Sequence, residues 1–160
     1  MSKHPTIKAV LTNPVHFLAF GFGSGLSPVA PGTMGTIVAI PIFILFSQLT
    51  LINYIILLII LTILSFYIAG KSADLLGVHD HGGIVIDEIC GYLVTMILAP
   101  VTWQAIIAGF ILFRIFDIFK PWPIKLLDRR VPGGIGIVVD DLMAGIYALS
   151  SLQLILWLVK

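Results

Sequence analysis

The chain has 160 residues, 59% of them hydrophobic and only 11% charged, and its net charge is +1. Because a soluble domain usually has about 25% charged residues, this composition excludes an ordinary soluble protein and indicates an integral membrane protein with one compact domain. The low net charge gives no basis for nucleic-acid binding. A single cysteine, Cys90, excludes an internal disulfide bond and a cysteine-based metal site.

The N-terminal segment carries Lys3 and Lys8 ahead of a weak apolar run that Pro14 interrupts. A cleaved signal peptide needs a cleaner apolar core and a small-residue cleavage site, so we do not expect one here. Residues 16–22 are too few to cross a bilayer, and we expect them to form an interfacial or re-entrant helix. A glycine-rich stretch, GFGSGLSPVAPGT, occupies residues 21–33.

Five apolar segments approach the length of a membrane span, which is about 20 residues with a range of about 17–25. They cover residues 33–47, 49–69, 84–99, 102–119 and 137–159. Pro41 is expected to kink the first, and Pro100 and Pro121 end the third and fourth. The sequence therefore predicts an all-α integral membrane protein. We expect a compact bundle of about five transmembrane helices, with residues 1–160 forming a single domain.

The basic residues orient this predicted bundle. If the first span leaves from the inside, eight basic residues lie inside and one, Lys160, lies outside. The positive-inside rule then places the N-terminus in the cytoplasm. With five spans, the C-terminus lies on the opposite side.

The acidic residues gather under the same topology, since all eight lie between Asp74 and Asp141. Five of them, from three predicted spans, converge near the cytoplasmic face: Asp87, Glu88, Asp117, Asp140 and Asp141. Ionisable residues within spans are candidates for a functional site because each costs about 2.5–3.5 kcal/mol to insert. Clustered carboxylates need a cation, and hard oxygen ligands favour Mg²⁺, Mn²⁺ or Ca²⁺. The sequence thus predicts a metal site.

Residues suited to phosphate lie beside these acids. Arg114 and Asp117 are three positions apart and therefore neighbours on a helix, and Lys120 lies about one turn further on. Arg129 and Arg130 follow in the sequence. Arginine makes bidentate contacts with phosphate, and lysine supplies a point charge. The glycine-rich stretch reaches the same face with its backbone N–H groups, and its Thr33 is placed to cap the first predicted span.

Each of these features also has a plainer interpretation. Arg114 with Asp117 is also the pattern of a helix-end ion pair, and Arg129 with Arg130 that of a topology anchor at anionic lipid heads. Asp140 and Asp141 also suit the first turn of a helix. The glycines fit helix packing, and the histidine pair in GVHDHGG fits a solvated loop. The convergence of all these features at one face supports a functional site more strongly than any single feature does.

Common phosphate motifs do not fit the sequence. The stretch GFGSGLS has no Lys-Ser or Lys-Thr pair, as a P-loop needs, and Leu26 stands where G-x-G-x-x-G requires its last glycine. Cys90 is not followed six residues later by an arginine, as a cysteine-based phosphatase would require. With these motifs excluded, the reaction class that fits the sequence is metal-assisted chemistry on a phosphate near the membrane surface.

Four stretches together resemble a known family. They are GFGSGLSPVAPGTMGT, IVIDEICGYLVTM, FRIFDIFKPWPI with LDRR, and GGIGIVVDDLMAG, and they cover residues 21–145. In this order they resemble the bacterial phosphatidylglycerophosphatase A family of membrane enzymes. The resemblance implies Mg²⁺-dependent removal of the terminal phosphate of phosphatidylglycerophosphate, giving phosphatidylglycerol. It also implies a multi-pass protein of the bacterial cytoplasmic (inner) membrane, surrounded by membrane lipids, with its active site on the cytoplasmic side.

The resemblance also implies roles for individual residues. One or two Mg²⁺ ions would be held by Glu88, Asp117, Asp140 and Asp141, with help from Asp87. The catalytic residues would be Glu88, Asp117, Asp141 and Lys120. The substrate-binding residues would be Ser24, Ser27, Thr33, Arg114, Lys120, Arg129 and Arg130. Direct attack by water is the preferred mechanism, and an aspartyl-phosphate intermediate is the alternative. No role is carried onto the stretch from His79 to His81.

Two other classes of protein share some of these features. A CDP-alcohol phosphotransferase also uses acidic helices and Mg²⁺, but its D-x₂-D-G-x₂-A-R signature is absent from the sequence. A small ion or solute transporter would place acids near the bilayer midplane, often with repeat symmetry, whereas these acids are predicted at one face. The number of metal ions, the acyl-chain preference and the oligomeric state stay open.

Overall fold

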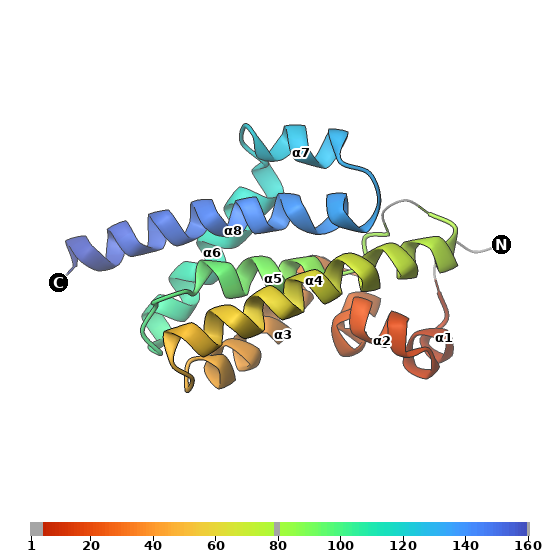
Figure 1. Cartoon of the computed structure of the whole chain (residues 1–160), viewed down its shortest axis with the longest axis horizontal. Coiled ribbons are helices and arrows are strands. Elements are labelled where there is room, and N and C mark those ends of the chain that lie inside the picture. The colour runs from red at the N-terminus through yellow and green to blue at the C-terminus, as the bar shows by residue number, and fades with distance from the viewer. Residues whose placement is uncertain (1–4, 79–80, 160) are drawn as a thin grey trace.

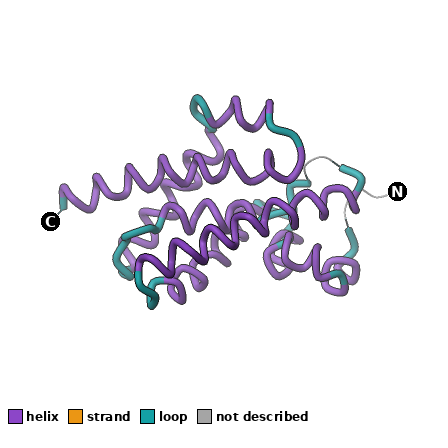
Figure 2. Tube along the Cα trace, in the orientation of Figure 1, coloured by secondary structure: helices purple, strands orange, loops and turns teal. Residues whose placement is uncertain are grey.

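The computed structural model describes residues 5–78 and 81–159. This part of the chain consists of helices and connecting loops, without a strand (Figure 2), in agreement with the all-α prediction. The elements in chain order are α1 Ile7–Thr12, α2 Pro14–Ala19, the 3₁₀ helix η1 Gly21–Leu26, α3 Pro31–Phe46, α4 Leu51–Leu76, α5 Ile86–Thr95, α6 Trp103–Phe119, α7 Ile124–Arg130 and α8 Gly133–Leu158.

The prediction of about five transmembrane helices is wrong. Among the described residues, two helices are long and apolar enough to cross a membrane, α4 and α8. α3 has 16 residues, α5 has 10 and α6 has 17. A helix rises about 1.5 Å per residue, so α5 spans only about 15 Å of a hydrocarbon core that is about 30 Å thick.

The end of α5 explains part of this difference. The apolar run extends to Ala99, but the helix ends at Thr95, and the C-terminal capping residue Met96 leaves helical geometry. Leu98 then adopts a left-handed backbone with φ of 61°. The long apolar run is therefore divided between a helix and a turn, which hydropathy alone does not detect.

The helix starts follow ordinary capping chemistry. The side chains of Thr6, Asn13, Thr50 and Thr102 accept hydrogen bonds from backbone N–H groups in the first turns of α1, α2, α4 and α6. α3 differs, because its N-terminal capping residue is Ala30, which makes no side-chain cap, and Pro31 begins the helix. Thr33 lies inside the first turn, so the prediction that Thr33 caps this helix is wrong.

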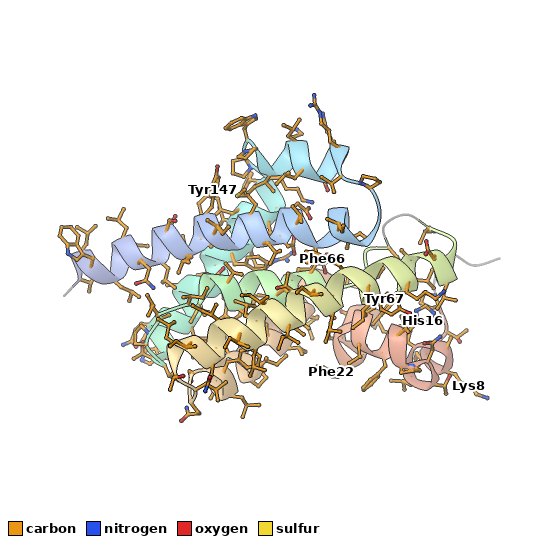
Figure 3. The ribbon with its side chains drawn as sticks, viewed as in Figure 1. Lys8, His16, Phe22, Phe66, Tyr67 and Tyr147 are labelled. Carbon is orange, nitrogen blue, oxygen red and sulfur yellow. The ribbon has the colours of Figure 1, made fainter. Side chains whose placement is uncertain are left out.

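The segment predicted as one interfacial or re-entrant helix, residues 16–22, is divided between two elements. α2 ends at Ala19, and Phe22 in η1 has a left-handed backbone with φ of 59°. α2 packs against α4, and His16 is buried there with its Nδ1 2.8 Å from Ser72 Oγ. Figure 3 shows His16 between the two helices and Lys8 extending away from them.

α8 is the central helix of the bundle and packs against α4, α5, α6 and α7 (Figure 1). Small residues bring α5 and α8 together, since a Cβ added to Gly91 would lie 2.7 Å from the carbonyl oxygen of Asp141, and a Cβ on Gly145 would overlap the carbonyl of Gly91. The close approach of these two backbones places the acidic start of α5 beside the acidic pair of α8.

Candidate active site

The acidic residues of three helices line one cavity of about 140 Å³. α5 contributes Asp87 and Glu88, α6 contributes Asp117, and α8 contributes Asp140 and Asp141. Lys120 and Asp128 line it as well. The structure therefore brings together the five carboxylates that the sequence grouped, although the topology used to group them had too many spans.

The acids lie at different places along their helices. Asp87 and Glu88 are in the first turn of α5, and Asp117 is near the end of α6. Asp140 and Asp141 lie about two turns into α8, which begins at Gly133, and both are only 3% exposed. The plainer interpretation of this pair as first-turn acids is therefore wrong, and dipole stabilisation at a helix start does not explain why they are buried.

Asp87, Glu88 and Asp141 form the tightest part of the cluster. One carboxylate oxygen from each lies within 4.8 Å of the others. Four buried oxygens have no hydrogen-bond partner among the described residues: Asp87 Oδ1, Glu88 Oε2, Asp140 Oδ1 and Asp141 Oδ2. Unpaired buried carboxylate oxygens are costly, so this donor set fits a hard divalent cation such as Mg²⁺.

Burial and mutual repulsion act on the carboxyl groups of α5. Burial, followed by the charges of Glu88 and Asp141, raises the pKa of Asp87 well above its ordinary value. Burial likewise raises the pKa of Glu88 to about 7, against the lowering effects of hydrogen bonding to Asp87 and the nearby charge of Arg114. A bound cation would offset both effects by favouring the ionised forms.

Arg114 neutralises one side of the cluster. Its Nη1 lies 2.5 Å from Asp117 Oδ2 and 3.7 Å from Glu88 Oε1. Asp117 is thus engaged by an arginine, whereas the carboxylates of Asp87 and Asp141 face one another. The buried Nε of Arg114 has no hydrogen-bond partner within the described chain. Arg114 itself is not among the described residues that line the acidic cavity, and it reaches the site through its contacts with Asp117 and Glu88.

Lys120 neutralises the other side. Its ammonium group contacts Asp140 Oδ2 and lies 2.8 Å from Asp128 Oδ1. Although burial opposes the charge of Lys120, hydrogen bonds to Asp128 and Asp140 raise the pKa of its ammonium above the ordinary value. Lys120 is the C-terminal capping residue of α6 and has a left-handed backbone, so the chain turns sharply where this side chain is presented.

The glycine-rich stretch reaches the cluster through Gly32. A Cβ on Gly32 would overlap Glu88 Oε1 and lie 3.1 Å from Arg114 Nη1. The position thus leaves no space for a side chain while the Glu88–Arg114 pair holds its place. Helix packing was the plainer interpretation of these glycines, but their contact with Glu88 and Arg114 was not predicted.

The polar residues predicted in the same stretch lie elsewhere. Ser24 Oγ donates to the Phe20 carbonyl at 3.4 Å, and Ser27 Oγ donates to the Val29 carbonyl at 2.8 Å. Of the described residues that line the acidic cavity, none is Ser24, Ser27 or Thr33. In the described structure these three predicted substrate-binding residues therefore do not form the wall of the acidic cavity.

Arg129 and Arg130 are exposed at the end of α7. In the described part of the chain, the acidic cavity is lined instead by their neighbour Asp128. Sequence reasoning missed Asp128. A usable signal was present, because Pro121 and Pro123 predict a reversal of the chain that returns the next acidic residue towards Lys120.

Comparison with known proteins gives a consistent result. The family described as Phosphatidylglycerophosphatase A matches residues 17–156. Phosphatidylglycerophosphatase A of Escherichia coli (strain K12) is 45% identical over 146 residues, covering 91% of this chain and 85% of that protein. Phosphatidylglycerophosphatase A of Haemophilus influenzae is 44% identical over 147 residues, covering 91% and 90%.

A more distant relative carries a different name. A Bacteroides thetaiotaomicron protein named as a candidate phosphatidylinositol-3-phosphatase is 32% identical over 165 residues, covering 98% of this chain and 99% of its own. No solved structure matches the chain significantly.

Proposed function

The chain belongs to the phosphatidylglycerophosphatase A family and is a phosphatase, and we propose that it uses Mg²⁺ to convert phosphatidylglycerophosphate into phosphatidylglycerol. The observation that carries this proposal is the cavity in which four buried carboxylate oxygens lack partners among the described residues. Lys120 lines this cavity, and Arg114 contacts its acids from behind Asp117 and Glu88. Such a site combines ligands for a hard cation with donors for a phosphate.

Asp87, Glu88 and Asp141 would hold the metal, with the unpaired Oδ1 of Asp140 as a further ligand. When bound, Mg²⁺ supplies Lewis-acid polarisation of the phosphoryl oxygens. Asp117 would act mainly by orienting Arg114, which it contacts at 2.5 Å. Asp117 would therefore contribute to catalysis through the position of Arg114 rather than by binding the metal.

Arg114 and Lys120 would stabilise the negative charge on the phosphate. The Nε of Arg114, which lacks a partner among the described residues, would provide one donor. Lys120 has three N–H bonds and uses contacts to Asp128 and Asp140, so one remains for the substrate. Donors fixed in place before the reaction are more effective than mobile ones, and ion pairs fix both residues.

Removal of the metal gives the direct test of this proposal. We expect the purified protein in detergent micelles to release phosphate from phosphatidylglycerophosphate with Mg²⁺, and to lose at least about a hundredfold in rate after treatment with EDTA, because a Lewis acid contributes several kcal/mol. Added Mg²⁺ should restore the rate. Phosphatidic acid and phosphatidylinositol 3-phosphate, assayed alongside, define the substrate. Undiminished phosphate release in EDTA would contradict the metal assignment.

The exposed side chains support a membrane location. Two candidate spans were found among the described residues, and α4 exposes large apolar side chains such as Ile52 at 71% and Ile63 at 60%. An exposed apolar surface of this kind is suited to lipid. We therefore propose that α4 and α8 cross the bacterial inner membrane.

The cytoplasmic side is the proposed location of the active site. Lys71 lies near the end of α4, and Lys120, Lys125, Arg129 and Arg130 lie between α4 and α8 in the sequence. A close approach of Gly70 and Gly134 places the end of α4 beside the start of α8. Since basic residues concentrate on the cytoplasmic side of membrane proteins, this end of the molecule is expected to face the cytoplasm.

Labelling with a membrane-impermeant maleimide tests the orientation. In a Cys90→Ala background, Lys125→Cys places an exposed thiol on α7. In spheroplasts of a bacterial host it is expected to react only after the membrane is permeabilised. Gln48→Cys, exposed between α3 and α4, is the matched variant and is expected to react in intact spheroplasts. The reverse pattern would place the acidic cavity on the outer side.

A further inference from the structure

A second, larger cavity lies beside the acidic one. Its volume is about 760 Å³, and the two cavities share Gly82 in their linings. Its walls are formed by residues of α1 and η1, by the segment before α3, and by residues 78 and 81–83 after α4. Figure 1 shows α1, α2, the end of α4 and the start of α5 gathered at one end of the molecule. The large cavity therefore adjoins the site that carries the carboxylates, at Gly82.

The sizes of the two cavities suit different parts of one ligand. Pockets that enclose a drug-sized molecule usually measure about 300–1,000 Å³, so the acidic cavity of about 140 Å³ has room for a phosphate group but not for a lipid. The rest of a lipid phosphate must leave the acidic cavity. Gly82 marks a place where it could do so, because no atom of the described residues lies within 4 Å of a Cβ built on that residue.

The chemistry of the walls fits the lipid part of such a ligand. Most of the lining is apolar: Pro5, Ile7, Phe20, Leu26, Pro28, Pro31 and Val78. Polar groups occur at Ser27 and His81. Exposed apolar side chains also occur in the segments that form this lining, where Ile7 is 66% exposed and Val29 75%. A molecule with a polar end near Gly82 and an apolar end towards the surface would match this distribution.

We propose that the second cavity binds the glycerol backbone and the first methylene groups of an acyl chain of the substrate, while the terminal phosphate lies in the acidic cavity. This inference rests on the proposed phosphatase function and adds the means by which a lipid is bound at the same site. Ser27, for which the family resemblance implies a role in substrate binding, would then contact the lipid part. The glycine-rich stretch would serve both cavities, through Ser27 in one and through Gly32 beside the other.

A pair of charge substitutions on one helix provides the test. Ile7→Asp introduces a carboxylate into the cavity wall, and its side chain is largely exposed, so folding should survive. Leu11→Asp is the matched control: it lies on the same helix and is similarly exposed, but of these two residues only Ile7 belongs to the described lining. Both variants alter any general attraction of α1 for the micelle surface equally.

The measurement is the steady-state hydrolysis of dioleoyl phosphatidylglycerophosphate in mixed micelles. Ile7→Asp is expected to raise KM at least about tenfold with kcat within about twofold, since uniform binding energy is lost, and Leu11→Asp should change neither. Gly82→Leu, which narrows the junction of the two cavities, should also raise KM. Size-exclusion chromatography in detergent accompanies each variant.

Several results would overturn the inference. Equal effects of Ile7→Asp and Leu11→Asp would show that α1 acts only through the micelle surface, and a fall in kcat without a change in KM would remove the cavity from substrate binding. A change of oligomeric state in Ile7→Asp alone would make a second copy of the chain the occupant. Failure of the wild-type protein to release phosphate would instead refute the proposed function.

Discussion

Asp141→Asn is expected to lower kcat by at least about a hundredfold, the loss that even an outer-shell partner of a metal can produce. Asp141 is 3% exposed, its Oδ2 lacks a partner among the described residues, and it belongs to the tight group with Asp87 and Glu88. Asparagine preserves the shape of the side chain and removes the charge. The loss of activity should therefore reflect the loss of a metal ligand rather than a change in packing.

The same substitution is expected to make the metal-free protein more stable. Three carboxylates with oxygens within 4.8 Å of one another repel each other without a cation, so removing one charge should raise Tm in EDTA. Mg²⁺ should raise the Tm of the wild type by preferential binding to the folded state and have a much smaller effect on the variant. Asp74→Asn, which changes an exposed acid on α4, serves as the control for net charge.

These two measurements separate the metal assignment from a structural role. A purely structural Asp141 would lower Tm in EDTA when replaced, and the response of the variant to Mg²⁺ would match that of the wild type. That pair of results would contradict the assignment of Asp141 as a ligand even if activity were lost.

Arg114→Met is expected to lower the free energy of unfolding by about 3 kcal/mol, because removal of one partner from a buried ion pair leaves an uncompensated charge. Asp117 at 2.5 Å and Glu88 at 3.7 Å would both lose their cation, and all three side chains are no more than 15% exposed. Methionine retains most of the apolar packing of the arginine stem. Denaturation in EDTA, with Lys125→Met as the exposed control, gives the comparison.

The double variant Arg114→Met with Asp117→Asn distinguishes stability from catalysis. It is expected to recover about half of the lost stability, since one of the two stranded carboxylates is neutralised, while phosphate release stays at least about a hundredfold below the wild type. Recovery of activity together with stability would mean that Arg114 only maintains the fold. Arg114→Lys should rescue activity poorly, since an ammonium group lacks the planar fork of a guanidinium.

Helix positions were predictable where prolines or threonines mark them. The predicted segment 102–119 agrees closely with α6 because Thr102 caps its start and the chain turns at Lys120 before Pro121. The predicted segment 49–69 is shorter than α4, which continues to Leu76. The last residues of α4 include polar side chains, so the hydropathy pattern placed the end of the helix too early. α8 begins at Gly133, four residues before the predicted start at 137, directly after Pro132. Hydropathy located the apolar parts of helices rather than the helices themselves.

The grouping of the acids was predictable from the alternating order of the segments, and the details of their pairing were not. The sequence places Arg114 and Asp117 one turn apart, so their contact follows from helix geometry. The contact of Lys120 with Asp128 and Asp140 depends on the left-handed backbone of Lys120 and on the return of α7, which no periodic pattern encodes. The need for glycine at position 32 likewise follows only from the side chains that pack against it, which the sequence pattern does not identify.

The central place of α8 has a consequence for biosynthesis. α8 comes last among the described helices, yet it packs against α4, α5, α6 and α7 and supplies Asp140 and Asp141. While the ribosome is still making this segment, the earlier helices lack their common packing partner, and Lys120 lacks one of its two carboxylates. The bundle and its acidic cavity are therefore completed together, once α8 has been synthesised, and a nascent chain without α8 has neither.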